Sequence, residues 1–271
     1  MYIFKLMILI FFSSTLYQNI FADCPAENCE EYKVCSPRLT QNHIFYAGPE
    51  IYYVNRLREK GAKQKGWVYG GRVGYDRIKR NRIYWGLDAV YAGGRLHGHS
   101  SKGSELKSNF YDANIEGRIG YTFQQKRSCR IFVTPFLGGG YGEETNNFVH
   151  PSPLTIHTQI KYGYVCGGFL SGMSVGCDWF IGLNFKAKYL IDAKNKISHD
   201  SEFDDVTMRV KNEMQYRVEL PVVYKWCYGF DFGVVPFYEY RHYGQQVNFP
   251  FDFIETKLNI YGATFKLIYN L

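Results

Sequence analysis

Apolar and polar side chains alternate along most of this chain with a period of two residues. The stretch near residue 230 shows the pattern, because Phe230, Phe232 and Val234 alternate with Asp231 and Gly233. Successive side chains of an extended strand point to opposite faces, so this spacing gives one apolar face and one polar face. The pattern therefore predicts an all-β fold.

The alternation recurs in ten segments. They lie at residues 43–55, 67–77, 82–93, 110–123, 130–142, 158–173, 179–192, 206–226, 228–243 and 253–271. Most of them exceed the roughly 9–11 residues that a tilted β-strand needs to cross a bilayer. The connections alternate between tight turns (78–81, 124–129, 174–178 and 226–228) and longer stretches (56–66, 94–109, 143–157, 194–205 and 244–252). An even number of strands places both ends of the chain on one side.

The apolar rows are bounded by aromatic residues, and the opposite rows carry charges at alternate positions. The row that starts at Phe230 closes with Tyr238 and Tyr240, while Glu239 and Arg241 lie on the other face. Charges spaced in this way are costly in a dry core but are compatible with a wet or ion-paired barrel interior. Rings at two levels are typical of transmembrane β-barrels, where they lie at the membrane interfaces.

The last segment supports the same interpretation. Phe265, Leu267, Tyr269 and Leu271 put apolar side chains on one face up to the carboxyl end. In these features the chain resembles small bacterial outer-membrane β-barrel proteins, although their last residue is usually Phe. The resemblance implies an antiparallel up-and-down transmembrane barrel of about ten strands over 43–271, with tight turns and both termini in the periplasm. A secreted sandwich or a lipocalin-like barrel is the alternative.

Composition agrees with a folded chain but does not choose between these classes. The sequence is 46% hydrophobic, 18% aromatic and 21% charged, which argues against disorder and against a coiled coil. The mean hydropathy of −0.29 is compatible with a soluble protein or with a barrel, since only alternate residues of a barrel strand face lipid.

The amino terminus is predicted to be a secretory signal peptide at 1–22. Lys5 supplies the positive charge, an apolar stretch follows at 6–12, and Ala22 ends an acceptable cleavage site. Asp23 precedes Cys24, where a lipoprotein site requires a small residue, so lipidation is not expected. Residues 23–42 are predicted to form a Cys-containing periplasmic segment. Nucleic acid is not an expected partner of an exported chain.

Six of the seven cysteines are candidates for disulfides on the periplasmic side. They are Cys24, Cys29, Cys35, Cys129, Cys177 and Cys227, all placed before the first strand or beside tight turns. The seventh, Cys166, is predicted on the apolar face of a strand. Disulfides persist in an oxidising compartment, within the chain or with neighbouring envelope proteins. This feature resembles the cysteine-rich envelope proteins of chlamydia-like bacteria.

The inward-facing rows are predicted to collect charges of both signs. They are Glu50, Arg72, Asp76, Asp88, Glu116, Arg118, Lys161, Lys186, Lys188, Arg217, Glu219, Asp231, Glu239, Arg241 and Lys257. These side chains could line a narrow ion path, or they could form a salt-bridge lattice that fills a small barrel. The mixture of signs favours pairing, since a selective pore is expected to carry rings of one sign.

Six histidines fall at the predicted outer end, where an enzyme of the outer leaflet is the alternative function. They are His97, His99, His150, His157, His199 and His242. His199 with Asp200, Asp204 and Asp205 resembles the Asp/His sites of omptin proteases, but a matching Asp pair earlier in the chain is absent. Ser198 and Ser201 flank His199, as a lipid A deacylase would require. No catalytic, metal or cofactor residue is assigned, and no cofactor is expected.

The predicted outer loops differ in charge. The first carries Arg56, Arg58, Lys60, Lys63 and Lys65, and the fourth is acidic. The basic loop could contact lipopolysaccharide phosphates or host polyanions, or it could simply be solvated. The sequence therefore predicts a non-enzymatic outer-membrane surface protein that acts through its loops in adhesion, surface contact or envelope anchoring. A narrow channel is a further alternative.

Overall fold

The computed structural model describes residues 43–124, 131–153, 155–175, 178–199, 204–226, 229–249 and 252–271. The strands of these residues are β1 (Ile44–Arg58), β2 (Lys63–Arg77), β3 (Ile83–His99), β4 (Glu105–Tyr121), β5 (Phe123–Gln124), β6 (Ile131–Val149), β7 (His157–Val175), β8 (Trp179–Ser198), β9 (Val206–Arg209), β10 (Met214–Glu219), β11 (Val222–Lys225), β12 (Phe230–Tyr243) and β13 (Thr256–Asn270). The 3-10 turn η4 (Glu59–Gly61) joins β1 to β2. The predicted signal peptide, the 23–42 segment and all six candidate disulfide cysteines lie outside the described residues.

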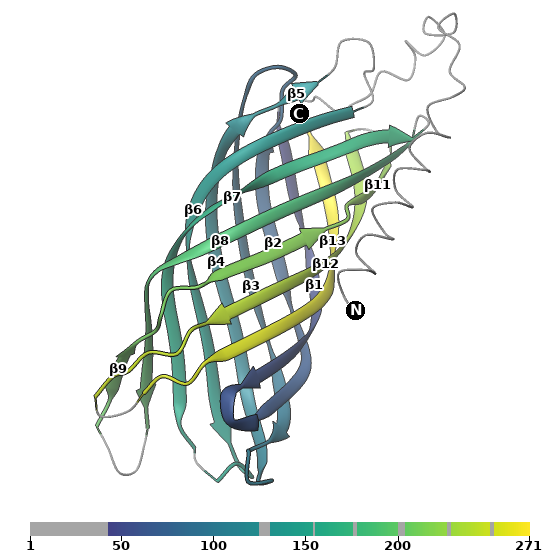
Figure 1. Ribbon diagram of the computed structural model, residues 1–271. Coiled ribbons are helices and arrows are strands. Elements are labelled where there is room, and N and C mark those ends of the chain that lie inside the picture. The colour runs from purple at the N-terminus through teal and green to yellow at the C-terminus, as the bar shows by residue number, and fades with distance from the viewer. Residues whose placement is uncertain are drawn as a thin grey trace, which may run out of the picture. The chain divides into compact units, whose positions relative to one another are not determined.

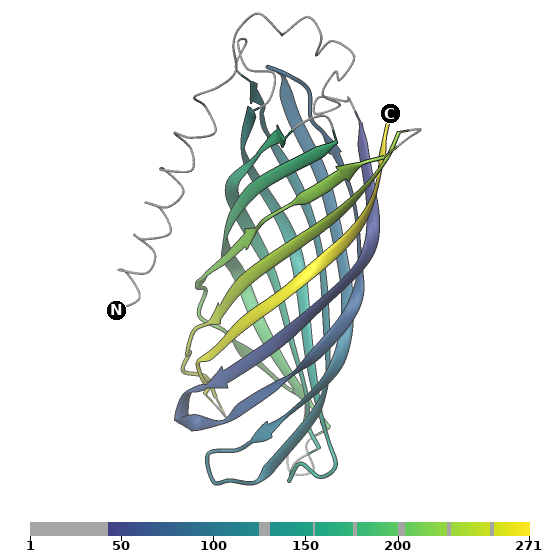
Figure 2. The ribbon, with the colours of Figure 1, turned by 90° about the vertical axis from the view of Figure 1, so that its right-hand side faces the viewer.

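These strands close into a single antiparallel barrel (Figures 1 and 2). The first strand pairs with both β2 and β13, so that Tyr53 lies opposite Trp67 on one side and Tyr261 on the other. β4 and β5 together occupy one strand position of the barrel. β9, β10 and β11 together occupy another, between β8 and β12. The described residues therefore build a barrel with ten strand positions, which confirms the predicted fold class.

The two ends of the barrel differ. At one end the backbone N–H of Leu271 donates to the carbonyl of His43 over 2.9 Å, so both ends of the barrel sequence lie there with the tight turns. We call this the short-turn end. At the other end, the tip end, the chain between strands consists of 59–62, 100–104, 150–156, 199–205 and 244–255.

At four of the five tip-end connections the strands reach further toward the tip end than predicted, so those predicted loops are too long, whereas the fifth, predicted at 244–252, spans 244–255. Residues 94–99 continue β3 and 105–109 begin β4, while 143–149 continue β6. Here the outward residues are polar, such as Arg95 and His97, so no apolar row marks the strand. An outward face needs apolar side chains only where it meets lipid.

The outer wall carries an apolar band between two aromatic belts. Leu137, 71% exposed, and Ile119, 62% exposed, face outward within the band. The short-turn belt consists of Phe45, Trp85, Tyr121, Phe123, Trp179, Tyr224, Trp226, Phe230, Phe232 and Tyr269. The tip belt consists of Trp67, Tyr69, Tyr91, Tyr111, Tyr141, Tyr189, Tyr216, Tyr238 and Tyr261. Exposed apolar side chains on this scale are stable only against an apolar solvent, so this wall is built to face lipid. Among the described residues no helix is long and apolar enough to cross a bilayer.

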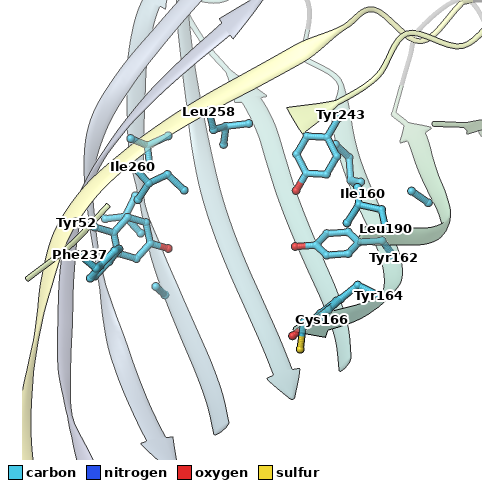
Figure 3. Close-up of a cluster of buried hydrophobic side chains, with 14 of the residues drawn as sticks. Tyr52, Ile160, Tyr162, Tyr164, Cys166, Leu190, Phe237, Tyr243, Leu258 and Ile260 are labelled. Atoms are coloured by element: carbon cyan, nitrogen blue, oxygen red, sulfur yellow. The ribbon is translucent and has the colours of Figure 1, made fainter. Parts of the chain in front are cut away.

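Apolar side chains fill the barrel interior toward the tip end. Leu96, Phe110, Leu190 and Leu258 are fully buried there. Figure 3 shows Tyr162 of β7 beside Tyr243 of β12, and Tyr52 of β1 beside Phe237 of β12. We call these side chains the interior core.

Cys166 belongs to this interior and not to the outer row predicted for it. Its side chain is buried, whereas the neighbouring Val165 is 50% exposed. On β7 both rows carry apolar side chains, because the inward row contributes Ile160, Tyr162 and Tyr164 to the core. Alternation alone therefore could not tell the two faces of β7 apart.

Candidate functional site

The charged side chains inside the barrel form ion pairs, and the first group of these is centred on Arg72. Its guanidinium donates to both carboxylate oxygens of Glu50 on the neighbouring β1 and, over 2.5 Å, to Asp88 on β3. Glu50 also accepts the Thr264 hydroxyl at 2.7 Å, and Asp88 accepts the Tyr46 hydroxyl at 2.7 Å. All of these side chains are buried, so the carboxylates exchange water for fixed donors.

A second group surrounds Glu116 on β4. The Lys186 ammonium lies 2.9 Å from both carboxylate oxygens, and the Tyr164 hydroxyl donates over 2.9 Å. Arg118 lies closer to Asp76, at 3.3 Å, than to Glu116, at 3.7 Å. Cross-barrel partners therefore neutralise Glu116 more directly than its neighbour along the strand.

A third group links β10 to β12. Arg217 donates to Glu219 over 2.7 Å and to Glu239 over 2.8 Å, and its guanidinium packs 3.7 Å from the centre of the Phe237 ring. Arg241 donates to Glu239 over 2.9 Å and to Asp112 over 2.7 Å. We call these three groups the charge lattice.

The structure places most of the predicted interior charges inside. Glu50, Arg72, Asp88, Glu116, Arg118, Lys186, Arg217 and Glu219 belong to the lattice, and Asp231 accepts from Asn270 at 2.7 Å near the short-turn end. Lys161 and Lys257, also predicted inside, lie on the outer wall beside Glu143 and Glu255. Both lie near the tip end, where polar residues occupy the outward row as well.

Several interior charges of the described residues were not included in the predicted set. Asp112 and Lys266 are inward on β4 and β13, and Glu144 pairs with Arg241 at 3.6 Å. Arg56, predicted in a basic loop, is buried on β1 with its guanidinium 3.9 Å from Glu144. The alternation carries the signal for all of these: Asp112 and Lys266 lie within predicted strands, whereas Glu144 and Arg56 require strands longer than predicted.

A cavity of about 170 Å³ lies below the lattice, toward the short-turn end. Apolar side chains such as Phe132, Phe180 and Ile268 line it together with the cations Lys186 and Lys266. Leu96, Phe110 and Leu258 of the interior core do not contribute to it. The cavity is therefore confined to the short-turn half of the barrel.

The histidines at the tip end do not converge on a common centre. His157 and His199 have ring centroids 4.3 Å apart, while His97 and His99 lie on the outer face of β3. His242 hydrogen-bonds to Glu255 over 2.7 Å, and hydrogen bonds from Lys257 and His242 lower the pKa of the Glu255 carboxyl. Within the described ranges no three His, Cys, Asp or Glu side chains are grouped as a metal site requires.

The predicted hydrolase pair is only partly assembled in the described residues. Ser198 Oγ lies 3.3 Å from His199 Nδ1, and both side chains are at the tip end. A catalytic histidine is normally oriented by a third group, and no described carboxylate bonds to His199. Asp200 and Ser201 lie outside the described residues.

A closed antiparallel barrel with an apolar outer band and an ion-paired interior defines an outer-membrane-type β-barrel. No protein-family model matches the sequence, and no curated protein matches it significantly. Solved barrel structures are similar in fold. The translocator domain of the autotransporter NalP from Neisseria meningitidis is 8% identical, with 96% of this chain and 98% of that chain covered and a TM-score of 0.47.

Two further solved structures are similar to the chain. The transport unit of the autotransporter AIDA-I from Escherichia coli is 8% identical over 92% of this chain and 100% of that chain, with a TM-score of 0.40. The outer membrane protein OprG from Pseudomonas aeruginosa is 10% identical over 86% and 99%, with a TM-score of 0.36. None of these similarities bears on what this chain binds. The resemblance to chlamydial envelope proteins gains no support from them.

Proposed function

We propose that this chain is a non-enzymatic surface protein of a bacterial outer membrane, with both termini and the tight turns in the periplasm. Its tips and the polar wall beneath them would serve adhesion, surface contact or envelope anchoring. The observation that carries the proposal is the length of strand beyond the tip belt. From Tyr141 to the end of β6 at Val149, eight steps of roughly 3.3 Å give about 26 Å of strand.

The interior supports a contact role more than a transport role. The tip end is filled by the interior core, and the described lattice charges are paired with one another inside the barrel. A side chain that is already paired and buried offers little to a passing ion. What remains available at the tip end is its outer surface.

The reconstituted barrel is accordingly expected to show no stable single-channel conductance. The chain is refolded in detergent, inserted into a planar bilayer and compared with a porin measured in parallel. Insertion is verified by recovering heat-modifiable protein from the same preparation. Steady unitary currents from the unaltered chain would contradict the closed interior and favour the narrow channel.

The orientation is tested by labelling intact cells with a membrane-impermeant maleimide. Lys102→Cys places a thiol in the 100–104 tip, and Arg82→Cys places one beside the β2–β3 turn; both positions are exposed. We expect the first variant to be labelled on intact cells and the second only after the outer membrane is permeabilised. The reverse result would place the tips in the periplasm, and the proposed function would fail.

The expected partners follow from this orientation. They are outer-membrane lipid and lipopolysaccharide, a host or surface ligand at the tips, and envelope proteins linked through the candidate disulfide cysteines on the periplasmic side. The non-enzymatic part of the proposal is tested by assays of hydrolysis. Turnover of a peptide library or of lipid A by the purified barrel, lost in His199→Ala, would overturn that part.

A further inference from the structure

The outer wall beyond the tip belt carries many cations, and outside the sector formed by β2, β3 and β4 most of the described ones, with the exception of Arg209, have a carboxylate partner. Lys194 lies 2.7 Å from Asp192 and Lys196 lies 2.6 Å from Asp205. Lys211 and Lys257 lie 3.0 Å from Glu213 and 2.7 Å from Glu255. Lys161 is paired more loosely, at 3.8 Å from Glu143. This part of the wall is close to electrically neutral.

The sector formed by β2, β3 and β4 is different. Lys63 and Lys65 on β2, Arg95 on β3 and Lys107 on β4 all lie on the outward rows beyond the tip belt. None of these four side chains forms an ion pair with a described carboxylate. Glu105 is the single carboxylate on the outward rows of this sector among the described residues, and it lies opposite His99 without a salt bridge. We call the four cations the basic patch.

The strand register brings these cations together. Lys65 lies directly opposite His97, which in turn lies directly opposite Lys107, so the three side chains form one row across three strands. Neighbouring strands lie about 5 Å apart, so Lys65 and Lys107 are separated by about 10 Å of wall with His97 between them. One anionic headgroup that lies over this row can contact both ammonium groups.

The patch lies directly beyond the part of the wall that faces lipid. Trp67 and Tyr69 of the tip belt precede it on the same face of β2, and Tyr91 and Tyr111 do so on β3 and β4. Aromatic belts mark the level of the lipid headgroups. Lys65 is two residues beyond Trp67, about 7 Å along the strand. The patch therefore faces sideways, at and just above headgroup level.

We infer that the basic patch binds the phosphate groups of a phosphorylated glycolipid of the outer leaflet, of the lipid A type. The inference rests on the proposed orientation, because it requires the tip end to face outward. The patch lies on the side of the wall, where lipid headgroups are adjacent to it. This placement favours a lipid as the ligand, because a soluble polyanion would reach the tips more readily than the side of the wall. Bound in this way, the glycolipid places its phosphates against Lys65 and Lys107, the two cations of this row.

The test compares two double variants of the full chain, refolded in a neutral detergent. Lys65→Gln with Lys107→Gln removes two cations of the patch, and Lys194→Gln with Lys257→Gln removes two paired cations of the same wall. Binding of diphosphoryl lipid A is titrated and read by native mass spectrometry. A cation near an anionic lipid surface contributes about 1 kcal/mol, so the patch variant is expected to bind about 30-fold more weakly and the control nearly as wild type.

The probes separate the sources of the anion. Dephosphorylated lipid A is expected to bind the unaltered chain at least as weakly as diphosphoryl lipid A binds the patch variant, because the variant still keeps Lys63 and Arg95. Equal weakening in both double variants, or in neither, would overturn the inference. So would a patch variant that loses retention on heparin while its lipid A binding is unchanged, which would assign the patch to a soluble polyanion. Labelling on intact cells tests the orientation separately, so a correctly oriented barrel that fails this test leaves the proposed function intact.

Discussion

Replacing Arg72 by Met is expected to destabilise the barrel by about 3–5 kcal/mol, although Met is apolar and of similar length. The guanidinium is buried and serves Glu50 and Asp88 at the same time. Without it, two carboxylates remain inside the barrel with their nearest cation gone. Removing one partner of a buried ion pair costs this much because the other charge stays desolvated and unpaired.

The same reasoning predicts partial rescue. Combining Arg72→Met with Glu50→Gln and Asp88→Asn removes the unpaired charges and keeps hydrogen-bonding groups for Thr264 and Tyr46. The triple variant is therefore expected to be more stable than the single variant. The free energy of unfolding is measured by urea titration in lipid vesicles, followed by tryptophan fluorescence and by the heat-modifiable band.

Lys194→Met is the matched control for this series. Its partner Asp192 is 2.7 Å away, but the two side chains are 49% and 68% exposed. An exposed pair is worth about 0–1 kcal/mol, so little change is expected. A triple variant as unstable as Arg72→Met would show that the shape of the arginine, and not its charge, holds this part of the lattice.

The sequence could predict which charges face inward but not which of them pair. Glu116 and Arg118 are two residues apart on one strand, and adjacency suggests that they are partners. In the folded barrel Glu116 is bound by Lys186, 70 positions away, and Arg241 reaches Asp112 across 129 positions. Such partners depend on the stagger of the strands around the barrel, which the alternation of a single strand does not contain.

The strand boundaries show a second limit of the pattern. The segment 206–226 is predicted as one strand, yet it divides into β9, β10 and β11. Pro221 has no N–H to donate to a neighbouring strand, so the regular strand is interrupted there. The carbonyl of Pro221 still accepts from Gly182, and the N–H of Leu220 donates to Pro236. The segment therefore remains part of the barrel wall although its regular pattern of backbone hydrogen bonds is interrupted.

The basic patch shows how extending the strands changes the interpretation of a charge cluster. As a loop, the stretch from Arg56 to Lys65 is a single group of cations. As part of β1 and β2 it divides by alternation, because Arg56 is buried inside while Lys63 and Lys65 lie outside. The outward pair then meets Arg95 and Lys107, which the sequence places 30 residues or more away. Only the register of the sheet brings them together.

Placing Arg at Leu183 is expected to cost about 2–4 kcal/mol of folding free energy in a bilayer. Leu183 faces outward on β8 between Trp179 of the short-turn belt and Tyr189 of the tip belt, and it is 44% exposed. A guanidinium at that depth must be desolvated or must pull water and headgroups toward the bilayer centre. The measured penalty for Arg on the lipid face of a barrel is largest at the midplane and falls to about 0–1 kcal/mol near the interfaces.

Thr145→Arg provides the control, because Thr145 lies on the outward row of β6 beyond Tyr141 of the tip belt. Both variants are unfolded with urea from vesicles of the same lipid, and the difference between their unfolding free energies is the quantity of interest. If the apolar band is the part of the wall that meets lipid, Leu183→Arg loses at least about 2 kcal/mol more than Thr145→Arg. Equal losses at the two sites would mean that the belts do not bound the membrane. The levels assigned to the tips and to the basic patch would then be wrong as well, since both are measured from the tip belt.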